Sequence, residues 1–106
     1  MSTRAIVAIR LPDDSILATY LHFDGYPDHV LPILASGYAD PDEVLELIQG
    51  GEIRSLPERP AMPEYYATSR NTNELADASE LPRLATYLNA EHLYLMNDDG
   101  WTHQKI

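Results

Sequence analysis

The sequence contains no cysteine, and basic residues are scarce. The first absence excludes disulfide bonds, catalytic thiols and zinc sites with cysteine ligands. Seven Lys and Arg face seventeen Asp and Glu, so the formal net charge is −10 at pH 7. Nucleic acids and anionic lipids are bound mainly through Lys and Arg, which argues against both as direct ligands. A protein partner with a basic surface is the natural complement.

Long hydrophobic runs are missing as well. No stretch is long enough to span a bilayer, and the residues after Met1 lack the small-residue cleavage site of a signal peptide. We therefore expect a cytoplasmic protein. The 106 residues, 44% of them hydrophobic, suffice for one packed core. We expect a single domain over residues 1–106 and no cofactor.

The charge is unevenly distributed along the chain. Between Arg10 and Arg54 there is no Lys or Arg, whereas the same segment holds nine Asp and Glu. Such segregation favours a surface patch of one sign over a mosaic of salt bridges. The simpler interpretation is a well-solvated acidic surface.

Two pairs of segments have the composition of β-hairpins. Residues 4–11 and 16–23 are rich in branched and aromatic side chains, and a Pro-Asp-Asp-Ser turn separates them. Residues 91–97 and 101–106 predict a second hairpin around an Asp-Asp-Gly turn. We interpret the acidic residues of both turns as solvated turn formers. Residues 52–56 and 64–70 are candidates for further short strands.

Helices are predicted over residues 28–36, 40–49 and 79–89. The clearest is the second, in which Asp40 is the N-cap, Pro41 the first helical residue and Glu43 the partner in a capping box. Gly50 or Gly51 ends it. Together these elements predict an α+β fold, with a mostly antiparallel sheet from the N- and C-terminal hairpins packed against two or three short helices.

Motifs of known enzyme classes are not found. The serines lie in no nucleophile elbow, and there is no Walker loop or dinucleotide fingerprint, so we expect a protein that is not an enzyme. The densest polar cluster is His22, Asp24, Asp28 and His29, whose side chains are of types that bind zinc, iron or manganese. A structural interpretation competes with this one, in which Asp24 forms a turn and His22 packs at the edge of the core.

Three carboxylates are predicted on the exposed face of helix 40–49, those of Asp42, Glu43 and Glu46. Asp42 and Glu46 lie one helical turn apart, which places their Cβ atoms about 5–6 Å from each other. This distance is similar to the spacing of successive phosphates along a nucleic-acid strand. Rows of carboxylates at this spacing can imitate a phosphate backbone and fill a basic groove meant for DNA or RNA.

The segment His22-Phe-Asp-Gly-Tyr-Pro-Asp-His29-Val resembles a motif of small proteins from phages and mobile elements, which carry His-Phe/Trp-Asp-Gly-Tyr-Pro-x-His-Val after an N-terminal hairpin. Residues 47–56 are similar to the second block of that group. The resemblance implies a phage setting. By analogy, small acidic phage proteins without cysteine resemble anti-CRISPR proteins of the DNA-mimic type.

We therefore expect a phage-encoded inhibitor of host defence, located in the host cytoplasm. Its acidic surface would block target-DNA binding by a CRISPR effector complex, at a Cascade-like subunit, without binding nucleic acid or membrane itself. An alternative is a small metal-binding protein or metal-dependent enzyme centred on the cluster from His22 to His29. Another is an accessory subunit that binds a basic host protein without DNA-like geometry. The partner-binding residues expected are Asp13, Asp14, Asp24, Asp28, Asp42, Glu43 and Glu46, with Tyr26 and Tyr38 as aromatic anchors.

Overall fold

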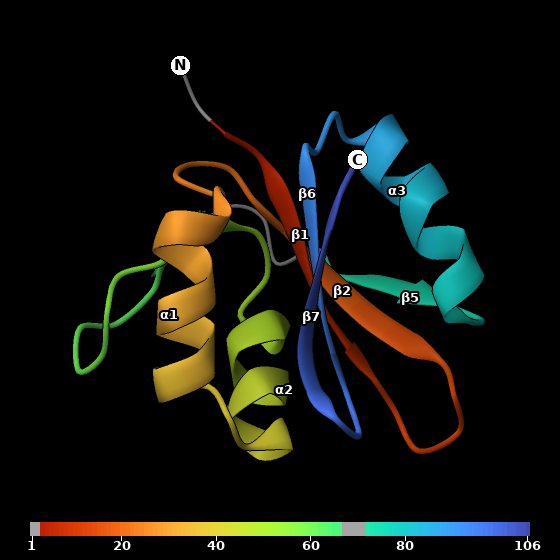
Figure 1. Cartoon of the computed structure of the whole chain (residues 1–106), viewed down its shortest axis with the longest axis horizontal. Helices are drawn as coiled ribbons and strands as arrows, with labels where there is room; N and C mark the ends of the chain where they lie inside the picture. The colour runs from red at the N-terminus through yellow and green to blue at the C-terminus, as the bar shows by residue number, and fades with distance from the viewer. Residues whose placement is uncertain (1–2, 67–71) are drawn as a thin grey trace.

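The computed structural model describes residues 3–66 and 72–106 (Figure 1). Its strands are β1 (Ala5–Arg10), β2 (Ile16–Leu21), β3 (Ile53–Ser55), β4 (Glu64–Tyr65), β5 (Asn73–Leu75), β6 (His92–Asn97) and β7 (Gly100–Lys105). Its helices are α1 (Pro27–Gly37), α2 (Pro41–Gln49) and α3 (Leu81–Tyr87), the last preceded by a 3₁₀ turn, η1 (Ala78–Glu80). None of the helices in these ranges is long and apolar enough to cross a membrane.

All seven strands join one mixed sheet. Its order is β4-β3-β2-β1-β6-β7. Strand β5 lies outside this order and pairs with β2, which also pairs with β3. The β1–β2, β2–β5, β3–β4 and β6–β7 pairs are antiparallel, whereas β1–β6 and β2–β3 are parallel. The two predicted hairpins and the α+β class are thus confirmed. The two parallel pairs, which join the hairpins to each other and to β3, were not predicted.

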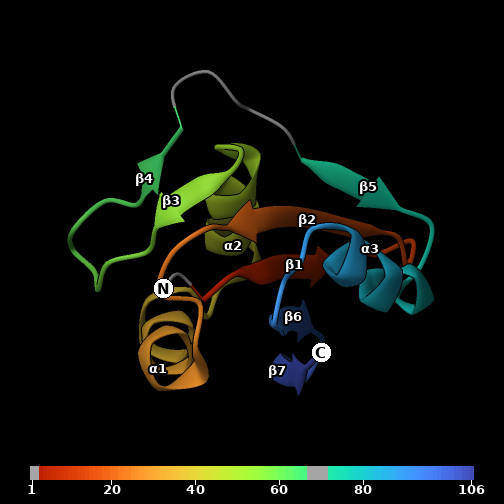
Figure 2. The same ribbon diagram turned by 90° about the horizontal axis from the view of Figure 1, so that it is seen from above.

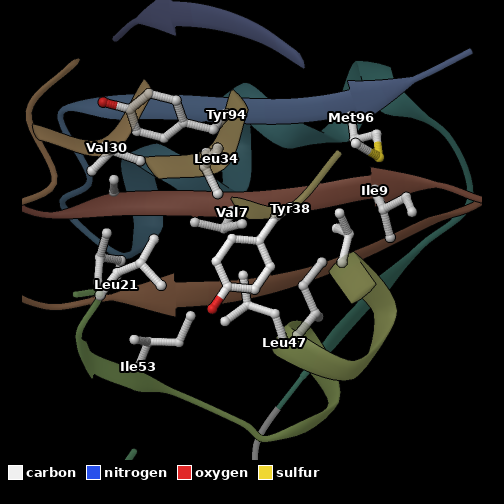
Figure 3. Close-up of a cluster of buried hydrophobic side chains, with 14 of the residues drawn as sticks. Val7, Ile9, Leu21, Val30, Leu34, Tyr38, Leu47, Ile53, Tyr94 and Met96 are labelled. Atoms are coloured by element: carbon white, nitrogen blue, oxygen red, sulfur yellow. The ribbon is translucent and has the colours of Figure 1, made fainter. Parts of the chain in front are cut away.

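The sheet is covered on both faces. Helices α1 and α2 lie on one face and α3 on the other, as Figure 2 shows. Each face of the sheet has its own hydrophobic core, and alternate residues of the central strand β1 pack into one or the other. Val7 and Ile9 belong to the core on the α1–α2 side, and Ile6 and Ala8 belong to the core on the α3 side. Figure 3 shows the first core, in which Tyr38 is surrounded by aliphatic side chains.

Helix α2 begins as its sequence predicts. A carboxylate oxygen of Asp40 accepts a hydrogen bond of 2.9 Å from the main-chain N–H of Asp42, and Pro41 follows the cap. At the other end Gly51 adopts a left-handed φ of 100°, a conformation that favours glycine. The capping-box role of Glu43 is wrong, because its Oε2 lies 2.9 Å from Nη1 of Arg59 instead.

The remaining elements differ from the expectations mainly in length. Helix α1 extends one residue beyond each predicted end, and α3 is shorter than residues 79–89 because its first turn is 3₁₀ and Asn89 turns the chain with φ 58°. Of the predicted strand 64–70 only Glu64–Tyr65 is a strand, and residues 67–70 lie outside the described ranges. Strand β5 was missed, because Asn73 and Glu74 have low strand propensity and pair with β2 through tertiary context.

Three tyrosine hydroxyls donate hydrogen bonds to main-chain carbonyls, and one of them is Tyr20 Oη, which binds the Leu88 carbonyl at 2.7 Å. Tyr94 Oη binds the Gly25 carbonyl and Tyr65 Oη the Leu47 carbonyl, both at 2.6 Å. Burial raises the pKa of Tyr65 to about 12 and raises the pKa of Tyr94 as well.

These hydroxyls make the free energy of unfolding sensitive to alkaline pH. In the unfolded chain tyrosine ionises near pH 10, so unfolding above about pH 10 releases protons that the native state retains. Their contribution is complete below pH 10, and we expect it to be lost as the pH rises towards 12. Urea titrations between pH 8 and 11.5 measure this loss. The Tyr65→Phe variant should show a shallower decline, and an unchanged pH dependence in that variant would contradict the assignment.

Candidate functional site

The fold brings two hairpin turns and the start of a helix to one end of the sheet. Because β6 runs parallel to β1, the β6–β7 turn lies at the same end as the β1–β2 turn. Helix α2 also starts at this end, at the bottom of Figure 1. A hollow of about 410 Å³ joins two of these segments, since Ala39 and Pro41 line it together with residues 97–100.

Six exposed aspartates lie in these three segments, and we call this set the acidic end. Arg10 is the basic residue that lines the hollow. The segments that contribute the aspartates are far apart in sequence, so the set becomes visible only in the folded chain. Its members are Asp13 and Asp14 in the β1–β2 turn, Asp40 and Asp42 at the start of α2, and Asp98 and Asp99 in the β6–β7 turn.

Local hydrogen bonds fix the two hairpin turns. Asp13 Oδ1 accepts from the N–H and the Oγ of Ser15, and these bonds, the hydroxyl's first, lower the pKa of Asp13. Asp14 has a left-handed φ of 68°, which Asp tolerates better than most residues. In the other turn Asn97 Oδ1 accepts from the N–H of Asp99, and Gly100 has φ 106°. The aspartates are therefore presented on ordered turns.

The carboxylates expected to form one partner-binding surface are divided between three places. Asp13, Asp14 and Asp42 belong to the acidic end. Glu43 and Glu46 lie further along α2, beside a groove of about 600 Å³ between this helix and the proline-rich loop 57–63. Asp24 and Asp28 are exposed at the opposite end of the sheet, where β2 ends and α1 begins, and there Tyr26 is also exposed.

Tyr38 is not a surface anchor, and that prediction is wrong. Only 1% of the residue is exposed, because Tyr38 directly follows the last residue of α1 and its side chain packs in the core beneath α1 and α2. Its carbonyl accepts a hydrogen bond of 2.9 Å from the indole Nε1 of Trp101. The guanidinium of Arg59 covers the remaining ring face, 4.2 Å from the ring centroid. Tyr38 therefore joins α1, β7 and the proline-rich loop.

Arg59 also changes the charge of α2. The segment from Arg10 to Arg54 has no base of its own, yet loop 57–63 folds back and places Arg59 against Glu43. Both side chains are about two-fifths exposed, so the pair contributes little to stability. It does neutralise one of the three carboxylates expected to stand free on this helix.

The two histidines of the motif bind different partners. His22 Nε2 lies 2.9 Å from Glu52 Oε1, and its ring packs between those of Tyr20 and Tyr66. His29 Nε2 lies 2.9 Å from the Leu56 carbonyl. Over residues 3–66 and 72–106, no group of three or more His, Asp or Glu side chains is arranged to hold a metal ion. Both imidazoles instead connect the β2–α1 region to the segment around β3.

Sequence reasoning missed the contribution of Asp98 and Asp99. Turn chemistry predicts that these residues are solvated, as they are, but their position beside α2 depends on the parallel β1–β6 pair. Two like-charged turn dipeptides, Asp13-Asp14 and Asp98-Asp99, one in each terminal hairpin, were the available signal. No protein-family model, curated protein or solved structure matches this chain.

Proposed function

We propose that this protein is a non-catalytic inhibitor that inserts its acidic end into the basic DNA-binding groove of a host defence protein such as a CRISPR effector. The observation that supports it is that six aspartates from three separate segments lie at one end of the sheet, where Asp98 and Asp99 line a hollow beside the start of α2. The short aspartate side chains sit on ordered turns, so little conformational entropy is lost when a partner binds them.

Electrostatics gives such an end two properties. First, a chain of net charge −10 is attracted to a basic groove over a distance set by the Debye length, about 8–10 Å at physiological salt. Association is then fast and weakens as salt is added. Second, carboxylates on three turns offer several acceptors to the Lys and Arg that otherwise hold phosphates.

The proposal is tested by competition. The immobilised protein captures its partner from a host lysate, and duplex DNA is then titrated against the purified complex. We expect DNA and the protein to displace each other, and the affinity to fall as salt is raised from 50 to 200 mM. The triple variant Asp13→Asn, Asp14→Asn, Asp98→Asn should bind about 10- to 100-fold more weakly, because each screened charge pair contributes about 0.5–1 kcal/mol.

A matched control neutralises carboxylates elsewhere. The triple variant Asp24→Asn, Asp28→Asn, Glu91→Gln removes the same charge at the opposite end of the sheet and should stay within about threefold of the parent protein. Equal losses in the two variants would mean that only net charge matters. A partner that binds DNA and this protein simultaneously would identify it as an accessory subunit and overturn the inhibitor proposal.

A further inference from the structure

Strand β7 forms an open edge of the sheet. The strand order ends at β7, and no other strand within residues 3–66 and 72–106 pairs with its outer side. Figure 1 shows β7 crossing the front of the molecule with no segment over it. Its six residues pair with β6 in one continuous register from Gly100 to Lys105.

The two edges of the sheet are protected very differently. The opposite edge strand, β4, has two residues, follows Pro63 directly and shifts register against β3, and all three features discourage pairing with another chain. Strand β7 has no proline and no Asp or Glu, and its one charged residue is the terminal Lys105. Strand β5, which also pairs on the outer side of β2, has only three residues, so β7 is the longest edge strand that the described residues offer for extension.

The hydrogen bonds of the last hairpin decide which groups are free on β7. The N–H of Ile106 donates to the Glu91 carbonyl at 2.9 Å. Because partners alternate along an antiparallel pair, Thr102 and Gln104 also direct their main-chain groups to β6. The N–H and C=O groups of Trp101, His103 and Lys105 therefore point outward.

We propose that two copies of this chain associate through antiparallel pairing of their β7 strands. In the register that centres the two-fold axis on Thr102, Trp101 of each copy faces His103 of the other, and their outward main-chain groups form hydrogen bonds. The same register places Lys105 opposite Asp99 of the second copy. The two sheets then continue as one, with equivalent faces on the same side.

Charge complementarity selects a second copy as the occupant. Two chains of net charge −10 repel each other across most of their surfaces. Along β7 the only charged residue is Lys105, and this register places it near Asp99 in the β6–β7 turn of the second copy, while the adjacent Asp98 lies opposite Ile106. The Thr102 pair at the axis is of a favourable cross-strand type.

Sedimentation equilibrium of the full chain tests the proposal. A single-strand interface is smaller than a standard one of about 1,600 Å², so we expect a dissociation constant of about 10–100 μM. The weight-average mass should rise from 11.9 kDa towards twice that value as the concentration increases from 5 to 500 μM. A mass that stays at 11.9 kDa throughout overturns the proposal.

A charge exchange identifies the register. Asp99→Lys and Lys105→Asp should each weaken association by about tenfold or more. Asp99→Lys makes the chain less negative, so a non-specific contact between two copies would become stronger in that variant, not weaker. The double variant restores the pair with the charge of the parent protein, and should dimerise within about threefold of it. Failure of this rescue overturns the register. Asp99 is unchanged in the acidic-end variant used to test the proposed function, so the two proposals fail independently.

A second variant tests the main-chain contact. His103→Pro removes an N–H that points outward and leaves the main-chain hydrogen bonds to β6 in place, while it also deletes the side-chain hydrogen bond between His103 Nε2 and His92 Nδ1 of β6. It should stay monomeric at 500 μM with an unchanged far-ultraviolet circular dichroism spectrum. His103→Ala, which loses the same side-chain hydrogen bond and keeps the outward N–H, is the matched control and should dimerise like the parent protein. Equal association of the two variants overturns the strand pairing.

Discussion

Replacing Tyr38 with alanine is expected to lower the free energy of unfolding by about 3–5 kcal/mol, the range for deleting a buried aromatic ring. The ring lies in the core beneath α1 and α2 and is 1% exposed. Its removal leaves a cavity between two helices and also frees the guanidinium of Arg59, which lies over the ring. The site cannot refill easily, because the surrounding side chains are held by the sheet.

Urea unfolding followed by fluorescence measures this effect. Trp101 is the single tryptophan, and its indole hydrogen-bonds to the Tyr38 carbonyl, so its emission reports directly on this part of the core. The control Tyr38→Phe keeps the ring and should cost about 1 kcal/mol or less. If the alanine and phenylalanine variants are equally stable, Tyr38 is not the core residue described above.

Gly25→Ala is expected to destabilise the protein by about 1–3 kcal/mol, through overpacking of a buried site. A Cβ at this position would lie 2.8 Å from both the Ala5 Cβ and the Thr3 carbonyl oxygen. Neither atom can move cheaply, because Ala5 begins the central strand and the Thr3 carbonyl accepts the Gly25 N–H. The Gly25 carbonyl in turn holds the Tyr94 hydroxyl.

The neighbouring motif residue provides the comparison. Tyr26 is 42% exposed, and Tyr26→Ala should change the free energy of unfolding by less than about 1 kcal/mol. Thermal or urea unfolding of the two variants gives both values. If the Gly25→Ala protein is as stable as Tyr26→Ala, the chain relaxes around the extra methyl group. That result would contradict the expected clash with Ala5 and the Thr3 carbonyl.

Local patterns explain which elements could be predicted. Helix α2 carries its own cap, its initiating proline and an apolar stripe, so its bounds follow from nearby residues. The N-terminal hairpin combines two apolar runs with a turn, and the C-terminal hairpin combines the apolar run of β6 with a turn and the mostly polar β7. The β1–β6 pair is different, because it joins Ala5 to His92 and no short-range signal specifies it. Strand β5 likewise depends on the edge that β2 offers.

The same distinction applies to the acidic end. That Asp13, Asp14 and Asp42 are exposed acids could be predicted from turn chemistry and helix periodicity. That these residues lie at the same end of the sheet as Asp98 and Asp99 could not be predicted, because it depends on the parallel β1–β6 pair. Tyr38 was misplaced for a related reason, since the residue after a helix can point either way and the packing of Trp101 and Arg59 decides the direction.

The parallel β1–β6 pair also governs when the acidic end exists. Most of the chain lies between β1 and β6. A large loop must therefore close before these two strands pair, and such non-local topology slows folding. During synthesis the N-terminal hairpin and α2 emerge first, while β6 and β7 are still missing. The acidic end can therefore be completed only after β6 and β7 have been synthesised, and an incompletely synthesised chain offers a basic partner only part of it.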